Sequence, residues 1–179
     1  PTVVIQLRDL PYYPPVTFTK GWSLVIAKTQ RNDTAAINPR IKSANFLNNV
    51  MAKREAVEAG VDDALMLNKD GFITESTVSN FFMVRGDELL TPAVGDGILA
   101  GITRQLVLDL GKAAGLDVRE ESIRPEELQN GQEAFLTLTS AGIIPIIRIN
   151  DLAFGSSVGP ITAKLRRLYE LEIENFLKG

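Results

Sequence analysis

The chain contains few side-chain types that could perform covalent chemistry. It has no histidine and no cysteine, which excludes a serine–histidine dyad, a thiolate nucleophile and zinc sites built from these residues, and we expect no metal site. Lysine is the strongest nitrogen nucleophile that remains, and it reacts when its amine loses a proton or condenses with a carbonyl group. Lys42 is the candidate, because it lies between a polar loop and a predicted helix. From residue type alone, a solvated lysine is the commoner outcome.

A carboxylate and two hydroxyl-bearing segments are the other candidates. Glu75 interrupts an apolar pattern between two predicted strands, where a carboxylate is costly unless it is paired; an exposed bulge is an equally good interpretation. The segment 101–104 begins a predicted helix whose free amides could bind a phosphate, although plain capping by Thr103 is commoner. The small, hydroxyl-rich segment 137–142 follows a predicted strand and suits either anion binding or a tight turn.

The elements that must position these residues are strands and helices in one α/β domain. Apolar runs predict strands at 2–8, 23–28, 63–68, 72–74, 80–84, 89–91, 117–123 and 133–138, with a further apolar run at 143–147. Helical spacing predicts helices at 44–59, from about 102 to Gly115, and at 160–176, with a helical turn at 125–129. A loop at 29–40 leads the chain to Lys42, which therefore precedes a helix.

Composition limits the classes of partner. Among 179 residues, 45% are hydrophobic and 23% are charged, as in an ordinary globular protein. The net charge of −3 and the pI near 5.1 offer no general attraction to nucleic acid or to an anionic membrane. No apolar run approaches the ~20 residues that span a bilayer, and no secretion signal precedes the first strand. We therefore expect a cytoplasmic protein, which the lack of cysteine also fits.

The candidate residues complement one another in chemical type, and the segments that contain them resemble those of one known family. A lysine amine, a carboxylate for a pyridine nitrogen and two phosphate-binding segments are the groups that pyridoxal phosphate requires. Four segments, in family order, resemble the class IV aminotransferases, which are pyridoxal-phosphate enzymes of fold type IV, and the resemblance covers most of residues 38–150. These segments are Arg40–Leu47, Gly71–Ser76 with Asn80–Phe82, Gly101–Arg104 and Thr137–Ala141.

The resemblance implies a role for each candidate. Lys42 would bind the coenzyme covalently and then move a proton between the substrate Cα and the coenzyme C4′. Glu75 would pair with the pyridine nitrogen and keep it protonated. Backbone amides and hydroxyls would hold the two anionic groups, the coenzyme phosphate at Ile102, Thr103 and Thr139, and the substrate carboxylate at Ser140 and Ala141.

The resemblance also implies a fold and a reaction. The fold is the large domain of the D-amino acid aminotransferase-like proteins, a mixed sheet partly curled into a barrel and flanked by helices. It would cover residues 1–179, with the family's small N-terminal domain absent, and would form a homodimer. The reaction would transfer an amino group between an amino acid and a 2-oxo acid. The sequences of residues 45–50 and 52–56 resemble branched-chain members more than other members of the family, which favours branched-chain substrates.

Three alternatives and three departures accompany this hypothesis. The alternatives are a D-amino acid aminotransferase, an aminodeoxychorismate lyase and a non-catalytic relic domain used for assembly. Phe46 stands where branched-chain members usually have tyrosine, a departure that D-amino acid members share. Ser76 stands where a glycine usually follows the acidic residue, and Gly142 replaces a common acidic residue.

Overall fold

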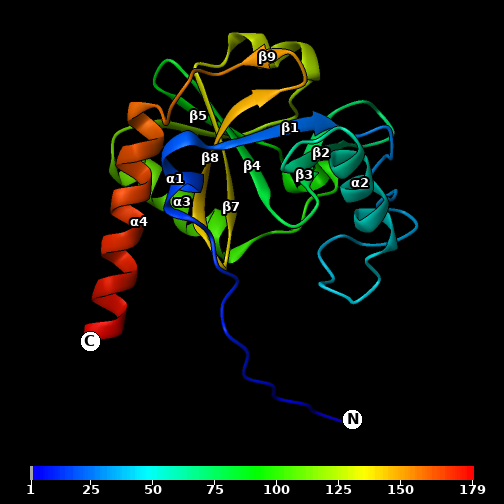
Figure 1. Ribbon diagram of the computed structural model, residues 1–179, viewed down its shortest axis with the longest axis horizontal. Helices are drawn as coiled ribbons and strands as arrows, with labels where there is room; N and C mark the ends of the chain where they lie inside the picture. The colour runs from blue at the N-terminus through cyan, green and yellow to red at the C-terminus, as the bar shows by residue number, and fades with distance from the viewer. Residues whose placement is uncertain (1) are drawn as a thin grey trace.

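Strands and helices follow one another along the chain in nearly the predicted order (Figure 1). In the computed structural model, which describes residues 2–179, the strands are β1 (Trp22–Ile26), β2 (Asp63–Leu67), β3 (Ile73–Ser76), β4 (Asn80–Arg85), β5 (Glu88–Thr91), β6 (Asp117–Glu120), β7 (Glu133–Leu138), β8 (Gly142–Ile149) and β9 (Leu152–Ala153). The helices are α1 (Pro15–Lys20), α2 (Leu47–Glu58), α3 (Ile102–Ala113) and α4 (Pro160–Lys178), with short 3-10 helices η1 (Val94–Asp96) and η2 (Pro125–Asn130).

The strands form one mixed sheet that closes into a barrel. The order β3–β2–β1–β8–β7–β4 returns to its start because β4 also pairs with β3. β1 is parallel to β2 and to β8, whereas the other pairs within the ring are antiparallel. β5 and β6 extend the sheet beyond β4, and β9 pairs with β8. The predicted fold class, a mixed sheet curled into a barrel and flanked by helices, is confirmed.

Alternating side chains give the barrel wall two buried faces. The interior holds one apolar cluster, whose members include Leu24, Leu65, Ile73, Phe81, Met83, Leu136 and Ile146. The outer face of β4 and β7 packs against α3 and α4 through Phe82, Phe135, Val107, Leu108 and Leu165. A third cluster, rich in alanine, seats α2 on the outer face of β1 and β2. Figure 1 shows α2 and α4 on opposite sides of the barrel, so each covers a different part of its wall.

The strand predicted at 2–8 was wrong. Residues 2–14 are all described and contain no helix or strand, and the side chains of Val3, Val4, Ile5 and Leu7 are 79–97% exposed. A strand needs a neighbour to accept and donate its backbone hydrogen bonds, and an apolar run alone does not supply one. The helix α1 follows and begins at Pro15, a position that suits proline because its missing N–H would have no helical partner.

Within residues 2–179, no helix is both long and apolar enough to cross a membrane.

Candidate active site

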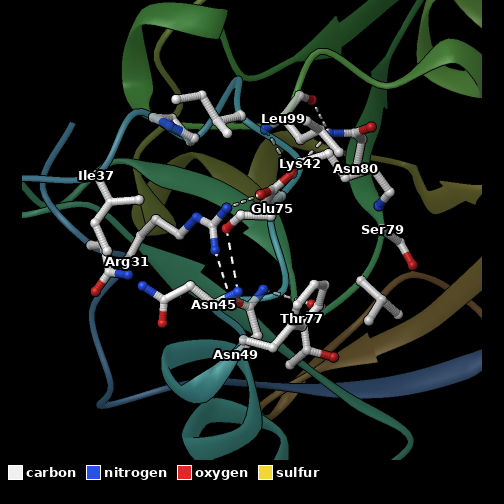
Figure 2. Close-up of a pocket in the computed structure, with 16 residues that line it drawn as sticks. Arg31, Ile37, Lys42, Asn45, Asn49, Glu75, Thr77, Ser79, Asn80 and Leu99 are labelled. Atoms are coloured by element: carbon white, nitrogen blue, oxygen red, sulfur yellow. Dashed lines mark hydrogen bonds and ion pairs between the residues drawn. The ribbon is translucent and has the colours of Figure 1, made fainter. Parts of the chain in front are cut away.

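Lys42 lies at a pocket formed by segments that are far apart in the sequence (Figure 2). The pocket is lined by the loop between β1 and α2, by the first turn of α2, by the β3–β4 connection and by Leu99. The Lys42 side chain is exposed and precedes α2, as predicted, although α2 begins at Leu47 rather than at residue 44. Phe46, which stands where branched-chain members usually have tyrosine, also lines the pocket.

Polar side chains of α2 hold the start of this loop in place. The Glu55 carboxylate accepts hydrogen bonds from the Lys28 and Thr29 amides and from the Thr29 hydroxyl. Asn48 donates to the Gln30 carbonyl and accepts from the Asn32 amide. These bonds satisfy backbone groups at the start of the loop, and the Arg31 amide donates to the Leu67 carbonyl of β2, so the loop leaves β1 along a defined path.

Glu75 is buried, which excludes the exposed bulge considered above. Its residue is 6% exposed, and its position depends on a one-residue register shift between β2 and β3. Leu65 pairs with Ser76, whereas Leu67 pairs with Ile73. Both leucines of β2 face the barrel interior. Between their partners on β3, Ile73 and Ser76, lie two residues instead of one. This extra residue turns the Glu75 side chain to the outer face of the sheet. There Glu75 pairs with Asn80 across the β3–β4 connection.

The Glu75 carboxylate has partners on both oxygens. Arg31 Nη2 donates to Oε1 at 2.6 Å, while the Leu99 amide and the Asn80 Nδ2 donate to Oε2 at 3.0 Å and 3.1 Å. Burial raises the pKa of Glu75 to about 7, and the charges of Arg31 and Lys42 and the Leu99 hydrogen bond oppose that rise. The pKa of the Glu75 carboxyl group is therefore close to neutral pH, and Lys42 lies close enough for its charge to lower that pKa.

Arg31 and Asn80 are functional candidates that the sequence did not identify. The Arg31 side chain is 12% exposed and also donates to Asn49 Oδ1 at 2.9 Å, and Asn49 in turn donates to the Thr77 carbonyl at 2.7 Å. Arg31 lies in a segment predicted only as a connecting loop, and nothing in its spacing marks it. A signal for Asn80 was present, because it belongs to a family-like segment. Figure 2 shows Arg31, Asn49 and Asn80 around Glu75.

The N-terminus of α3 follows the Lys42 pocket along the chain, because its N-cap residue, Gly101, comes two residues after Leu99. Leu99 lines that pocket, while Gly101 and Ile102 line a second one that is more open to solvent. Gly101 is the N-cap residue, and within the described chain no side chain caps the helix. Thr103 is the second helical residue, so the capping role considered for it is wrong. The first amides of α3 and the positive end of its dipole are thus available to an anion.

The three remaining candidates lie on the turn between β7 and β8. Thr139 is exposed, Ser140 and Ala141 are half-buried, and none of them lines the Lys42 pocket. The turn is nevertheless at the same end of the barrel, because Asn80 pairs with Thr137, two residues before Thr139. The Tyr13 and Ser140 hydroxyls are hydrogen-bonded at 3.0 Å. The structure therefore gathers Lys42 and Glu75 in one pocket, places Ile102 and Thr103 beside it, and leaves this turn outside its lining.

The donor set fits pyridoxal phosphate. The coenzyme requires an amine for its aldehyde, an anionic or hydrogen-bonding partner for its pyridine nitrogen, and donors for its phosphate. Lys42 could supply the amine, the buried carboxylate of Glu75 has its remaining lone pair on Oε1, and the uncapped start of α3 could supply donors.

Comparison with known proteins identifies the family. The model of the family described as amino-transferase class IV matches residues 1–149. Two relatives are the D-alanine aminotransferase of Bacillus licheniformis, 37% identical over 78% of this chain, and the aminodeoxychorismate lyase of Bacillus subtilis, 34% identical over 82%. The chain therefore belongs to the class IV aminotransferases. It covers 52% and 50% of the length of those relatives, about half of each.

Solved structures agree with this assignment. The branched-chain amino acid aminotransferase of Thermobaculum terrenum, crystallised in its pyridoxal-phosphate form, is 36% identical with a TM-score of 0.84, and the match covers 89% of this chain and 53% of that one. The branched-chain aminotransferase of Thermoproteus uzoniensis, crystallised with norvaline, is 38% identical with a TM-score of 0.78, over 84% of this chain and 50% of that one. The barrel is thus the fold that these enzymes share.

Proposed function

We propose that this chain binds pyridoxal phosphate and transfers an amino group between an amino acid and a 2-oxo acid. The observation that carries the proposal is the placement of Lys42 and Glu75 in one pocket, with the start of α3 tied to Glu75 through the Leu99 amide. The amine and the buried carboxylate thus share one pocket, and the uncapped helix N-terminus is joined to that carboxylate. Membership of the class IV family supports the same reaction.

Lys42 is the proposed catalytic residue. When bound, pyridoxal phosphate supplies an aldehyde carbon that amines can join and a ring that accepts electron density from the substrate Cα. The exposed Lys42 amine would hold the coenzyme until an amino acid displaces it. The freed amine would then act as the base that takes the proton from the substrate Cα and delivers it to the coenzyme C4′.

Glu75 and Arg31 would set the charge next to the pyridine nitrogen. An ionised Glu75 accepts a hydrogen bond from a protonated ring nitrogen, and a cationic ring is the better electron acceptor. Arg31, at 2.6 Å from Glu75 Oε1, favours the ionised carboxylate although burial raises the pKa of that group to about 7. Arg31 therefore acts through Glu75 and positions its carboxylate.

Two sets of backbone donors would hold the anionic groups. The amides of Ile102 and Thr103, with the Thr103 hydroxyl, are proposed to bind the phosphate, because they begin a helix that no side chain caps in the described chain. Thr139 is proposed to complete that phosphate site. The Ser140 and Ala141 amides, on the same turn, are proposed to bind the substrate carboxylate.

The proposed substrates are branched-chain amino acids and 2-oxo acids. The branched-chain enzymes among the structural neighbours support this choice, while two relatives carry the names of the alternatives, D-alanine transamination and aminodeoxychorismate cleavage. Assays of the purified protein with L-leucine and 2-oxoglutarate, with D-alanine and 2-oxoglutarate, and with aminodeoxychorismate separate the three. Turnover of D-alanine without L-leucine would contradict the branched-chain choice.

A homodimer is part of the proposal. The surface of α2 carries exposed apolar side chains, Leu47, Val50, Met51 and Val57, which are 52–69% exposed. An exposed apolar face of this kind favours contact with another protein surface. Light scattering on the purified protein measures the assembly directly, and a monomer at micromolar concentration would contradict it.

Covalent labelling tests the role of Lys42. Pyridoxal phosphate is added to the purified protein, borohydride fixes the coenzyme to the amine that holds it, and peptide mapping locates the adduct. We expect the adduct on Lys42, and its loss in Lys42→Arg, which keeps the positive charge. Lys112→Arg is the matched control, because Lys112 is an exposed lysine in the last turn of α3. An adduct on another lysine, or on none, would contradict the proposal.

A further inference from the structure

Asn80 occupies the point at which the barrel closes. It is the first residue of β4, it is 5% exposed, and it pairs with Glu75 of β3 on one side and with Thr137 of β7 on the other. The β3–β4 pairing that closes the ring is this Glu75–Asn80 pair. A side chain at this position therefore lies between the carboxylate and the strand that leads to the β7–β8 turn.

The Asn80 amide joins Glu75 to the segment before α3. Its Nδ2 donates to Glu75 Oε2 at 3.1 Å and to the Leu99 carbonyl at 2.8 Å. The Leu99 amide donates to the same Oε2 at 3.0 Å. The amide and the carbonyl of Leu99 are thus both hydrogen-bonded by the Glu75–Asn80 pair. The position of the segment that leads into α3 therefore depends on the position of the Glu75 carboxylate.

Gly101 brings the start of α3 against the same asparagine. A Cβ added at Gly101 would overlap Asn80 Oδ1 and lie 3.3 Å from its Cγ. The Gly101 backbone has φ −72°, which any residue adopts. The glycine is therefore required by the approach of the Asn80 amide and not by its own backbone conformation. The N-cap residue of α3 and the carboxylate of Glu75 both contact one buried side chain.

We propose that Asn80 is a positioning residue that sets the spacing between Glu75 and the N-terminus of α3, so that one ligand can bind both. This inference rests on the proposed function, in which Glu75 binds the pyridine nitrogen and α3 binds the phosphate. Pyridoxal phosphate is a rigid ring that carries its phosphate on a short CH2–O arm, so the separation of these two groups varies only within a narrow range. A protein that holds both partners at that separation before binding does not lose affinity to rearrangement.

The test measures how much the phosphate contributes to binding. Dissociation constants are measured by equilibrium dialysis for pyridoxal phosphate and for pyridoxal, which lacks the phosphate, and their ratio gives that contribution. Asn80→Ala removes the hydrogen bonds from Nδ2 to Glu75 and to the Leu99 carbonyl, and only the Leu99 amide then joins Glu75 to the start of α3. We therefore expect the ratio to fall by about tenfold or more, the scale of one lost hydrogen bond to a charged group. A role in stability alone would weaken both ligands by the same factor.

Two further variants keep the test decisive. Gly101→Ala places a methyl group against Asn80 and should lower the same ratio with every hydrogen-bonding group still present. The double variant Asn80→Ala with Gly101→Ala should bind no worse than Asn80→Ala, because the methyl group then has room. If Asn80→Ala does not fold, Gly101→Ala by itself supports or overturns the inference through the same ratio.

Asn68→Ala is the matched control. Asn68 also makes side-chain hydrogen bonds to backbone groups, at Asp96, Asp70 and Phe72, and it does not line the Lys42 pocket. We expect Asn68→Ala to lower the unfolding midpoint and to leave the ratio unchanged. An equal loss for both ligands in Asn80→Ala, with the phosphate preference of the wild type intact, overturns the inference and leaves the proposed function standing. A wild type that forms no borohydride adduct at Lys42 overturns the proposed function and the inference with it.

Discussion

Burial of Glu75 makes the stability of the protein depend on pH in a direction that can be measured. Burial raises the pKa of Glu75 from 4.5 to about 7. Between these two values the folded state holds a proton that the unfolded state has lost, so the free energy of unfolding falls as the pH rises. The difference between 4.5 and about 7, at about 1.4 kcal/mol per pH unit, corresponds to about 3 kcal/mol. Above pH 7 this cost of the buried charge is fully present.

The variant Glu75→Gln removes the titrating group and nearly keeps the shape of the side chain. We expect the difference in unfolding free energy between wild type and variant to change by about 3 kcal/mol between pH 4.5 and pH 8, in favour of the variant at high pH. For a chain of this length this is roughly 6–12 °C in the midpoint of thermal unfolding. The charge of Arg31 already lowers the pKa of Glu75, so the loss of this partner is included in the expected difference. Urea unfolding is measured at several pH values for both proteins.

Glu58→Gln is the control, because Glu58 is an exposed residue in the last turn of α2 that pairs with Arg54. Its profile should follow that of the wild type, since an exposed pair contributes little to stability. Parallel profiles for wild type and Glu75→Gln across pH 4.5–8 would refute the reasoning. That result would mean that Arg31 compensates fully for the burial of the carboxylate.

Two further substitutions test how the fold holds the β7–β8 turn and α4. Gly142→Ala should destabilise the protein by about 2–4 kcal/mol in urea unfolding, because Gly142 has φ +69° and a Cβ would lie 2.6 Å from the Tyr169 ring; an unchanged midpoint would contradict this. Glu133→Ala should cost about 1–2 kcal/mol, because the Glu133 carboxylate caps α4 by accepting from the Ile161 and Thr162 amides at 2.9 Å and 2.7 Å. Hydrogen exchange at these two amides should accelerate in Glu133→Ala, and unchanged protection there would contradict the capping role.

The elements that the sequence predicted well are those whose pattern is local. β7 has the predicted bounds, 133–138, and β4 extends the predicted strand by one residue. Both strands alternate between two buried faces, so four of the six residues of each are apolar and the run is long enough to recognise. The segment 2–8 has a similar apolar run and is not a strand. The difference between it and β7 is the presence of neighbouring strands, which is a property of the whole fold.

The same distinction separates the two halves of the candidate site. Lys42 and Glu75 could be proposed from the sequence because each lies in a short segment that resembles a segment of the class IV aminotransferases. A buried carboxylate must be paired, so the sequence also required that Glu75 have a partner if it was buried. It did not say which one, because Arg31 is 44 residues away in the chain, and the orientation of Glu75 depends on a register shift between β2 and β3. Partners of this kind follow from how the barrel closes, and Asn80, which pairs with Glu75 at that closure, is where sequence and fold together determine the geometry of the site.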